Sequence, residues 1–93
     1  MRLRWTEPAA SDLTHICDCI EEHNGSTTAR RVALSIYKRV SALAEFPELG
    51  RTGRKSGTRE LILGGLPYLA VYRFRGDAVE ILRILHGAQD WSP

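Results

Sequence analysis

The stretch Pro67-Tyr-Leu-Ala-Val-Tyr-Arg-Phe74 decides the fold, because it is the middle one of three strand-like runs in the last third of the chain. Within it, Leu69 and Val71 point to one face of a strand, and the residues between and beside them point to the other. Both faces are therefore largely apolar, which is typical of a central strand. The run predicts the middle strand of a sheet, with other parts of the protein packed on both of its faces.

The two neighbouring runs predict the strands that flank it. They read Thr58-Arg-Glu-Leu-Ile-Leu63 and Val79-Glu-Ile-Leu-Arg-Ile-Leu-His86. Gly64-Gly65 and Gly76-Asp77 lie between the runs as turns, and the second matches a two-residue hairpin with glycine first. Consecutive strands joined by short turns are antiparallel, so this part of the chain predicts a meander.

The first half of the chain predicts a short strand and a first helix. Arg2-Leu-Arg-Trp5 alternates polar and apolar residues. Thr6-Glu7-Pro8 is typical of a helix start, with a hydroxyl cap, an early acid and an early proline. Asn24-Gly25 ends the helix, because both residues tolerate a left-handed backbone. Its apolar stripe consists of Leu13, Ile16, Cys17 and Ile20.

A second helix follows at once, for which Ser26-Thr27-Thr28 offers caps and which Pro47 stops. Its buried stripe is Ala29, Val32, Ala33, Ile36, Val40 and Leu43. The short connection predicts an antiparallel helix pair, and residues 47–57 are expected to form a loop. The predicted fold class is α+β: one domain over residues 1–93, in the order β-α-α-β-β-β, with a helical hairpin packed on a mainly antiparallel four-stranded sheet.

Composition excludes several classes of protein. With 43% apolar and 26% charged residues, the chain is expected to be globular rather than disordered. It has no apolar run of about 18 residues and no signal segment, so we expect a cytoplasmic protein without membrane contact. Cys17 and Cys19 lie two apart on a helix and are expected to stay reduced. The spacing of the three histidines with these cysteines predicts no metal site, and Gly50-x-x-Gly53 is no phosphate-binding loop, so no cofactor is expected.

Cationic side chains are concentrated in the second half. Residues 51–93 hold 7 Lys and Arg against 4 Asp and Glu, and the segment from Gly50 to Thr58 contains Arg51, Arg54 and Lys55 without an anion. A further set, Arg59, Arg73, Arg83 and His86, interrupts the apolar strand runs. Such a surface suits nucleic acid or an acidic protein segment. The alternative for each arginine is ordinary polar alternation on the solvent face of a strand.

Five motifs occur in a recognisable order. They are Trp5-Thr-Glu-Pro-Ala-Ala-Ser-Asp-Leu13, Phe46-Pro-Glu-Leu-Gly-Arg51, Gly57-Thr-Arg-Glu-Leu61, Pro67-Tyr-Leu-Ala-Val-Tyr-Arg73 and Ile81-Leu-Arg-Ile-Leu-His-Gly-Ala-Gln-Asp-Trp91. With these motifs and this element order, nearly the whole chain resembles toxins of the RelE/ParE superfamily of bacterial type II toxin–antitoxin pairs. The resemblance implies a cognate antitoxin encoded beside the gene and a toxin–antitoxin hetero-oligomer.

The resemblance leaves two activities open. RelE-like members cut messenger RNA on the ribosome, whereas ParE-like members are described as inhibitors of DNA gyrase that perform no chemistry. In the ribonuclease branch an arginine usually follows the aromatic residue that opens the middle strand, and here that position is Leu69. The segment Gly87-Ala88-Gln89 also supplies neither the cation nor the phenol expected beyond the last strand. These departures favour the ParE branch, although His86 keeps the ribonuclease alternative, because imidazole titrates near neutrality.

Each activity implies a set of residues. For a gyrase inhibitor we expect no catalytic residues and a target-binding surface made of Arg51, Arg54, Lys55, Arg59, Arg73, Arg83, His86 and Trp91. Trp91 is either a core plug or an exposed anchor of that surface. For a ribosome-dependent ribonuclease the catalytic set is His86, Arg59, Arg73 and Arg83. A third possibility is a degenerate toxin or binding module with no remaining activity.

Overall fold

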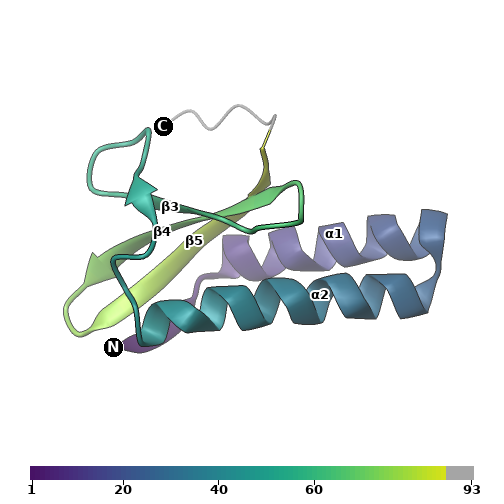
Figure 1. Cartoon of the computed structure of the whole chain (residues 1–93), viewed down its shortest axis with the longest axis horizontal. Helices are drawn as coiled ribbons and strands as arrows, with labels where there is room; N and C mark the ends of the chain where they lie inside the picture. Colours follow the sequence, from purple (N-terminus) through teal and green to yellow (C-terminus); the bar gives the residue numbers. More distant parts are fainter. Residues whose placement is uncertain (88–93) are drawn as a thin grey trace.

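The structure is a computed structural model that describes residues 1–87, and it consists of two helices packed along one side of a sheet (Figure 1). Strand β1 (Arg2–Trp5) is followed by helices α1 (Glu7–Asn24) and α2 (Ser26–Ser41), the short 3-10 helix η1 (Ala42–Ala44), and strands β2 (Arg51–Thr52), β3 (Arg59–Ile62), β4 (Tyr68–Arg75) and β5 (Ala78–His86). This order confirms the predicted α+β fold.

The two helices form the predicted antiparallel pair. Thr6 caps α1, since its Oγ1 accepts a hydrogen bond from the backbone N–H of Ala9 at 3.4 Å. Gly25 ends α1 with φ of 89°, a conformation that suits glycine. The prediction that a hydroxyl in Ser26–Thr28 caps α2 was wrong: Gly25 is also the N-cap of α2, and no side chain bonds to this helix start. A single residue between the helices leaves no room for a separate cap.

The sheet has five strands in the order β1-β5-β4-β3-β2, not the four predicted. Strand β1 runs parallel to β5, and all other neighbours are antiparallel. The additional strand, β2, lies inside the segment 47–57 that was predicted to be a loop. It pairs with β3 only through Arg51 with Glu60 and Thr52 with Arg59. Two residues are too few to show an alternating sequence pattern. This strand is therefore defined only by its pairing with β3, which the sequence does not reveal.

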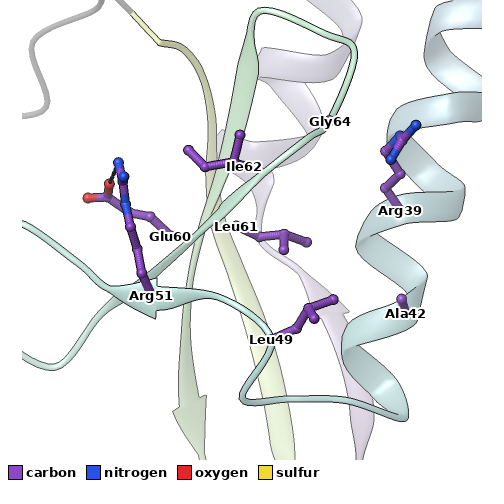
Figure 2. Close-up of a pocket in the computed structure, with 8 residues that line it drawn as sticks. All are labelled: Arg39, Ala42, Leu49, Arg51, Glu60, Leu61, Ile62 and Gly64. Carbon is purple, nitrogen blue, oxygen red and sulfur yellow. Dashed lines mark hydrogen bonds and ion pairs between the residues drawn. The ribbon is translucent and has the colours of Figure 1, made fainter.

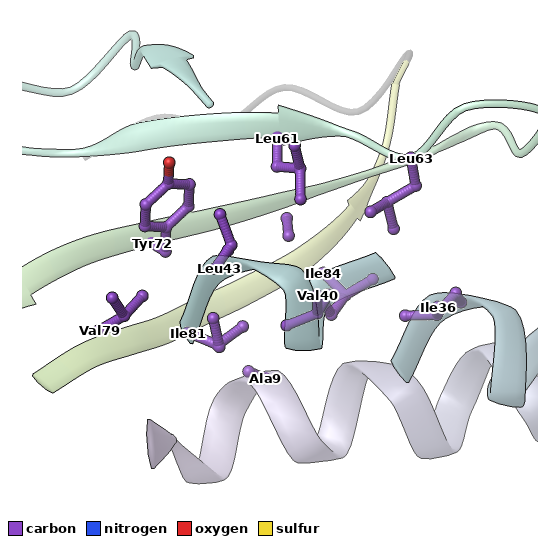
Figure 3. Packing of buried hydrophobic residues seen from close by; sticks show 11 residues of the cluster. Ala9, Ile36, Val40, Leu43, Leu61, Leu63, Tyr72, Val79, Ile81 and Ile84 are labelled. Atoms are coloured by element: carbon purple, nitrogen blue, oxygen red, sulfur yellow. The ribbon is translucent and has the colours of Figure 1, made fainter. Parts of the chain in front are cut away.

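The main core lies between the helices and the sheet (Figure 3). Ala9 of α1 and Ile36 and Val40 of α2 are fully buried against Tyr72 and Ile81 of the sheet. The predicted stripe of α2 therefore faces the core. On the opposite face of the sheet, a smaller apolar cluster contains Leu69, Val71, Leu82 and Leu85. The predicted division of β4 into two apolar faces is confirmed.

Three further expectations concern the cysteines, membrane spans and metal sites. Cys17 and Cys19 are free thiols, and burial, followed by the nearby carboxylates of Asp18 and Glu21, raises the pKa of the Cys17 thiol. No helix within residues 1–87 has both the length and the apolar character needed to cross a membrane. In the same residues, no three His, Cys, Asp or Glu side chains are grouped so that they could hold a metal ion.

Candidate functional site

The sheet face opposite the helices carries most of the charged strand residues. Cross-strand partners share a face, so the register places Arg4 and Arg73 beside Glu80, and Arg51 beside Glu60. The residue before Arg73 in β4 belongs to the core on the helix side, so these charges lie on the other side. We call this surface the basic face. Its cations include Arg4, Arg51, Arg54, Lys55, Arg73 and Arg83, and the alternation of the strands places Arg2 and Arg75 on it as well.

Glu80 joins two of these arginines. Its side chain is only 2% exposed, and its carboxylate lies 2.8 Å from Nη1 of Arg4 and accepts a hydrogen bond of 2.8 Å from Nε of Arg73. The hydrogen bond from Arg73 is the largest influence on the pKa of Glu80, which is lowered despite burial. Glu80 therefore stays ionised and fixes both guanidinium groups in place.

Glu60 plays the same role at the other end of the face. One carboxylate oxygen accepts from Nη2 of Arg51 at 3.3 Å, and the other accepts from the backbone N–H and the Nε of Arg54 at 2.9 and 3.3 Å. Burial acts to raise the pKa of Glu60, but these hydrogen bonds and the charge of Arg54 outweigh it, and the pKa is lowered. The loop after β2 is thereby held against the sheet.

Arg83 is fixed from α1. Its Nε and Nη2 donate to the two carboxylate oxygens of Asp12 at 2.6 and 2.9 Å, and this bond raises the pKa of Arg83. Asp12 also accepts the backbone N–H of Ile84 at 2.9 Å. Strand β1 ends at Trp5, opposite Ile81, so Asp12 satisfies an amide that has no strand partner there. The register of β4 and β5 shifts at this level, between Val71 and Tyr72.

Arg59 lies on the helix side of the sheet rather than on the basic face, since its cross-strand partner is Tyr72. Nη1 of Arg59 donates to the carbonyl of Gly50 at 2.7 Å and to that of Glu48 at 3.4 Å. The guanidinium also lies over the ring of Phe74, 5.7 Å from its centroid. The arginine thus holds the loop before β2.

His86 also lies on the helix side, because its cross-strand partner is Tyr68, which packs on the main core. The exposed imidazole meets the Tyr68 ring edge to face, with the ring centroids 5.9 Å apart. The four residues of the ribonuclease hypothesis are therefore divided: Arg59 and His86 lie on one side of the sheet, and Arg73 and Arg83 lie on the other.

A pocket of about 630 Å³ opens on the basic face. It lies between the start of α1, strands β4 and β5, and the loop before β3. Three predicted target-binding residues, Lys55, Arg73 and Arg83, line it together with Leu82. Among the lining residues that lie within residues 1–87, none is acidic. We call it the basic pocket.

A second hollow, of about 510 Å³, lies between α2 and β3 (Figure 2). Figure 2 shows Leu49 and Leu61 at its centre, with Arg39 on one side and the Arg51–Glu60 ion pair on the other. Leu49 is 56% exposed, and Ile62, which also lines the hollow, is 53% exposed. We call it the apolar groove.

The structure thus gathers only part of the predicted surface. Lys55, Arg73 and Arg83 meet in the basic pocket. Arg51 and Arg54 lie on the same face, where both bond to the carboxylate of Glu60. Arg59 and His86 lie elsewhere, and Trp91 falls outside the described residues. The sequence reasoning missed the acidic residues that position these cations, namely Asp12, Glu60 and Glu80. Their signal was present, because Glu60 and Glu80 interrupt apolar strand runs just as the arginines do.

Known proteins resemble this chain over almost its whole length. The family described as "ParE toxin of type II toxin-antitoxin system, parDE" matches residues 3–91. The chain belongs to this ParE toxin family. Relatives include the protein Y4kP of Sinorhizobium fredii, 46% identical over 97% of this chain and 92% of its own length. Toxin RelE2 of Caulobacter vibrioides is 38% identical over 91% of this chain and 93% of its own length.

Two further matches support the same assignment. Toxin ParE3 of Caulobacter vibrioides is 33% identical over 88% of this chain and 82% of its own length. A solved structure titled "Chromosomal ParDE TA system from P. aeruginosa" superposes with a TM-score of 0.87, at 33% identity, over 92% of this chain and 95% of the matched one. The superfamily and fold expected from the sequence are confirmed, and the chain is a ParE-family toxin of a type II toxin–antitoxin system.

Proposed function

We propose that this ParE-family toxin acts in the cytoplasm, inhibits DNA gyrase by protein–protein contact through its basic face, and is neutralised by a cognate antitoxin encoded beside it. The environment of Leu69 carries the choice of target. This residue stands where the ribonuclease branch has an arginine, is 3% exposed, and pairs with Ile62 and Leu85. A phosphoryl-transfer site needs preorganised charge at such a position, and here an apolar cluster occupies it.

The arrangement of the other candidate groups supports the same choice. A ribonuclease would require its base and its phosphate-binding cations to face one substrate. In this toxin Arg73 and Arg83 lie on the face opposite His86 and Arg59. The basic face offers instead a set of fixed cations, and such a set steers and orients a protein partner with complementary charge.

The antitoxin is the second partner in the proposal. The apolar groove exposes Leu49 and Ile62 between the cations Arg39 and Arg51. An extended or helical tail that alternates apolar and acidic residues would bury the leucine and isoleucine side chains and meet both cations. We propose that the antitoxin covers this groove, so that the two proteins form a hetero-oligomer.

A supercoiling assay with purified gyrase tests the target. The wild-type toxin is expected to inhibit supercoiling in a dose-dependent way, and Arg73→Ala is expected to need at least about tenfold more protein for the same effect. Arg30→Ala, an exposed cation of α2, serves as the matched control and should act like wild type. Unaltered supercoiling at a large excess of folded toxin would remove gyrase as the target.

Ribosome-dependent cleavage of messenger RNA is the second candidate, and one observation favours it. His86 is an exposed imidazole at the end of β5, beside the phenol ring of Tyr68. Primer extension on ribosome-bound message decides between the two. New discrete ends that disappear with His86→Ala would establish the ribonuclease and exclude contact-only inhibition. Their absence at toxic expression levels is the outcome we expect.

A further inference from the structure

The two helices of the hairpin carry opposite charges. Helix α1 contains acidic residues and neither lysine nor arginine, whereas helix α2 contains cations and no acidic residue. The acidic set is Glu7, Asp12, Asp18, Glu21 and Glu22, and the basic set is Arg30, Arg31, Lys38 and Arg39. The charge of the whole chain is only +2. Its near-balance therefore hides two helices whose charges are complementary.

These opposite charges do not pair with each other within one copy. Among residues 1–87, Asp12 is the only acidic residue of α1 whose side chain makes an ion pair or a hydrogen bond, and its partner is Arg83 of β5. In the same residues, no cation of α2 makes either contact. Glu21 and Glu22 also lie in the last turn of α1, where the helix dipole disfavours a carboxylate. The charges thus remain available to a partner.

Leu34 marks the centre of the basic surface of α2. Its side chain is 62% exposed, the largest value among the large apolar side chains of residues 1–87. The residues three and four positions before and after it are its neighbours on the helix surface, and they are Arg30, Arg31, Tyr37 and Lys38. All four are exposed. An apolar side chain ringed by three cations and a tyrosine favours a partner that is acidic and that also covers carbon atoms.

The outer surface of α1 has the complementary charge. Ala9, Leu13 and Ile16 pack in or against the core. The helical repeat therefore places Asp18 and Glu22 on the opposite side, and both are exposed. A second copy of this chain consequently offers carboxylates on α1 to the cations of α2.

The hairpin also projects past the sheet. Figure 1 shows that the end at which the helices join lies beyond the strands, and residues 21–27 at this end are all exposed. Ile16, Ile20 and Val32 are only partly buried between the helices. The apolar seam of the hairpin is therefore incompletely covered, and a second hairpin laid alongside would cover it.

We propose that the toxin forms a dimer with a second copy of itself, in which the two helical hairpins lie alongside each other and α1 of each copy meets α2 of the other. A twofold axis along the helices makes both contacts at once, because such an interface repeats each contact. Since Gly25 joins the helices, Arg31 lies at the same level along the hairpin as Asp18 and Glu22. In the dimer, Arg31 of one copy comes opposite these carboxylates of the partner copy.

This dimer goes beyond the proposed function, because it uses neither of the surfaces assigned there. The basic face lies on the other side of the sheet. The apolar groove is lined on α2 by Arg39 and Ala42, not by Arg31, Leu34 or Lys38. Variants of the hairpin contact are therefore expected to keep the contacts with gyrase and antitoxin.

Sedimentation velocity of the purified full-length toxin over a range of concentrations tests the proposal. Wild type is expected to pass from monomer to dimer as the concentration rises. Arg31→Glu and Glu22→Lys should each weaken the dimer at least about tenfold, because each reversal places like charges opposite one another at both symmetry-related contacts. Glu45→Lys, which reverses an exposed charge after η1, should dimerise like wild type.

A mixture of the two variants separates a contact between copies from an effect on the fold. Equimolar Arg31→Glu and Glu22→Lys should form a heterodimer about as tight as the wild-type dimer, because each variant supplies the charge that the other requires at both contacts. Thermal unfolding should show that both variants are folded, since both residues are exposed. A mixture that associates no more tightly than either variant alone would contradict the proposal.

Other outcomes assign the surface differently. A toxin that stays monomeric at its highest soluble concentration would overturn the dimer. If Arg31→Glu then weakened the complex with the antitoxin, the basic surface of α2 would belong to the antitoxin, and if it abolished binding of oligothymidylate, the surface would belong to nucleic acid. A dimer that both reversals leave unchanged would place the interface elsewhere in the molecule. Gyrase takes no part in these measurements, so their result is independent of the proposed target.

Discussion

Tyr72 is a buried residue whose hydroxyl group holds the loop between the helices and the sheet. The hydroxyl accepts a hydrogen bond from the backbone N–H of Gly50 at 2.8 Å and donates one to the carbonyl of Pro47 at 2.8 Å. A Cβ at position 50 would lie 2.7 Å from this ring, so the loop approaches it as closely as only glycine allows. The residue therefore links the core to the loop that leads into β2.

Removing this hydroxyl should destabilise the toxin without changing its shape. Tyr72→Phe leaves the N–H of Gly50 and the carbonyl of Pro47 without their partner, and we expect the free energy of unfolding to fall by about 1 to 3 kcal/mol. Tyr37→Phe is the matched control, because Tyr37 is 55% exposed and should change stability by less than about 0.5 kcal/mol. Urea denaturation measures both, and equal midpoints for the two variants would contradict the role of Tyr72.

Glu60 should make the stability of the toxin depend on pH on the acid side. Its pKa in the folded protein lies below the ordinary value of 4.5, so its contribution is present above that value and is lost as the pH falls through the folded pKa. Glu60→Gln should lower the free energy of unfolding by about 1 kcal/mol at pH 7, because its arginine partners are partly hydrated. The difference from wild type should shrink as the pH falls below about 4.

The matched control is Glu45→Gln, which changes an exposed carboxylate on the loop after α2. Urea denaturation at a series of pH values should show that the free energy of unfolding of this variant falls at low pH just as that of wild type does. A gap between Glu60→Gln and wild type that stays constant from pH 7 to pH 3 would show that the carboxylate acts through packing and not through its charge.

These residue-scale partnerships mark the limit of sequence reasoning. The sequence shows which strand residues are cationic. Whether an arginine faces solvent, a carboxylate or a backbone carbonyl depends on the pairing register of the strands. Arg73 meets Glu80 across β4 and β5, while Arg59, in an equally apolar run, reaches back to Gly50. Register is set by turns and by the bulge near Tyr72, and the sequence showed only the turns.

At the scale of elements, the hairpin between β4 and β5 shows how far turn chemistry can be predicted. The sequence predicted a two-residue turn with glycine first, and Gly76 indeed has a positive φ of 61°. Within residues 1–87, only glycines have positive φ. Strand β2 was missed because it has only two residues. Turn residues carry a local signal, whereas a two-residue strand is stabilised only by its neighbour.

The conformation of Gly76 gives a testable difference between two glycines. Gly76→Ala should lower the free energy of unfolding by about 1 kcal/mol, because alanine resists a left-handed backbone even though a Cβ at this position would meet no atom within 4 Å. Gly64→Ala, at the turn before β4, should stay within about 0.5 kcal/mol of wild type, since φ there lies outside the left-handed region and the nearest atom to its Cβ is 3.5 Å away. Thermal or urea unfolding measures both, and equal losses would contradict the backbone argument.

At the scale of the whole molecule, the toxin presents two different surfaces around one core. The helices bury one face of the sheet, the basic face lies opposite, and the apolar groove runs between α2 and the β3 edge. This division gives the proposed target contact and the proposed antitoxin contact separate surfaces on one small domain. The separation of the helix side from the basic face follows from the order of elements, which the sequence predicted. The groove depends on the position of the loop around Leu49, which the sequence did not predict.

Neutralisation by the antitoxin should therefore depend on the groove and not on exposed apolar residues in general. Co-expression with the small protein encoded beside the toxin gene should yield a stable complex, and antitoxin at about one hundred times its dissociation constant should add about 2.7 kcal/mol to the stability of the toxin.

Leu49→Asp places a charge in the groove and should weaken the complex at least about tenfold, because burying an unpaired carboxylate is costly. Leu34→Asp is the control, since Leu34 is 62% exposed on α2 and does not line the groove. Calorimetric titration of both folded variants compares them directly: a Leu49→Asp toxin that binds like wild type would exclude the groove, and a toxin that sediments alone in the presence of its neighbour's product would exclude the partnership itself.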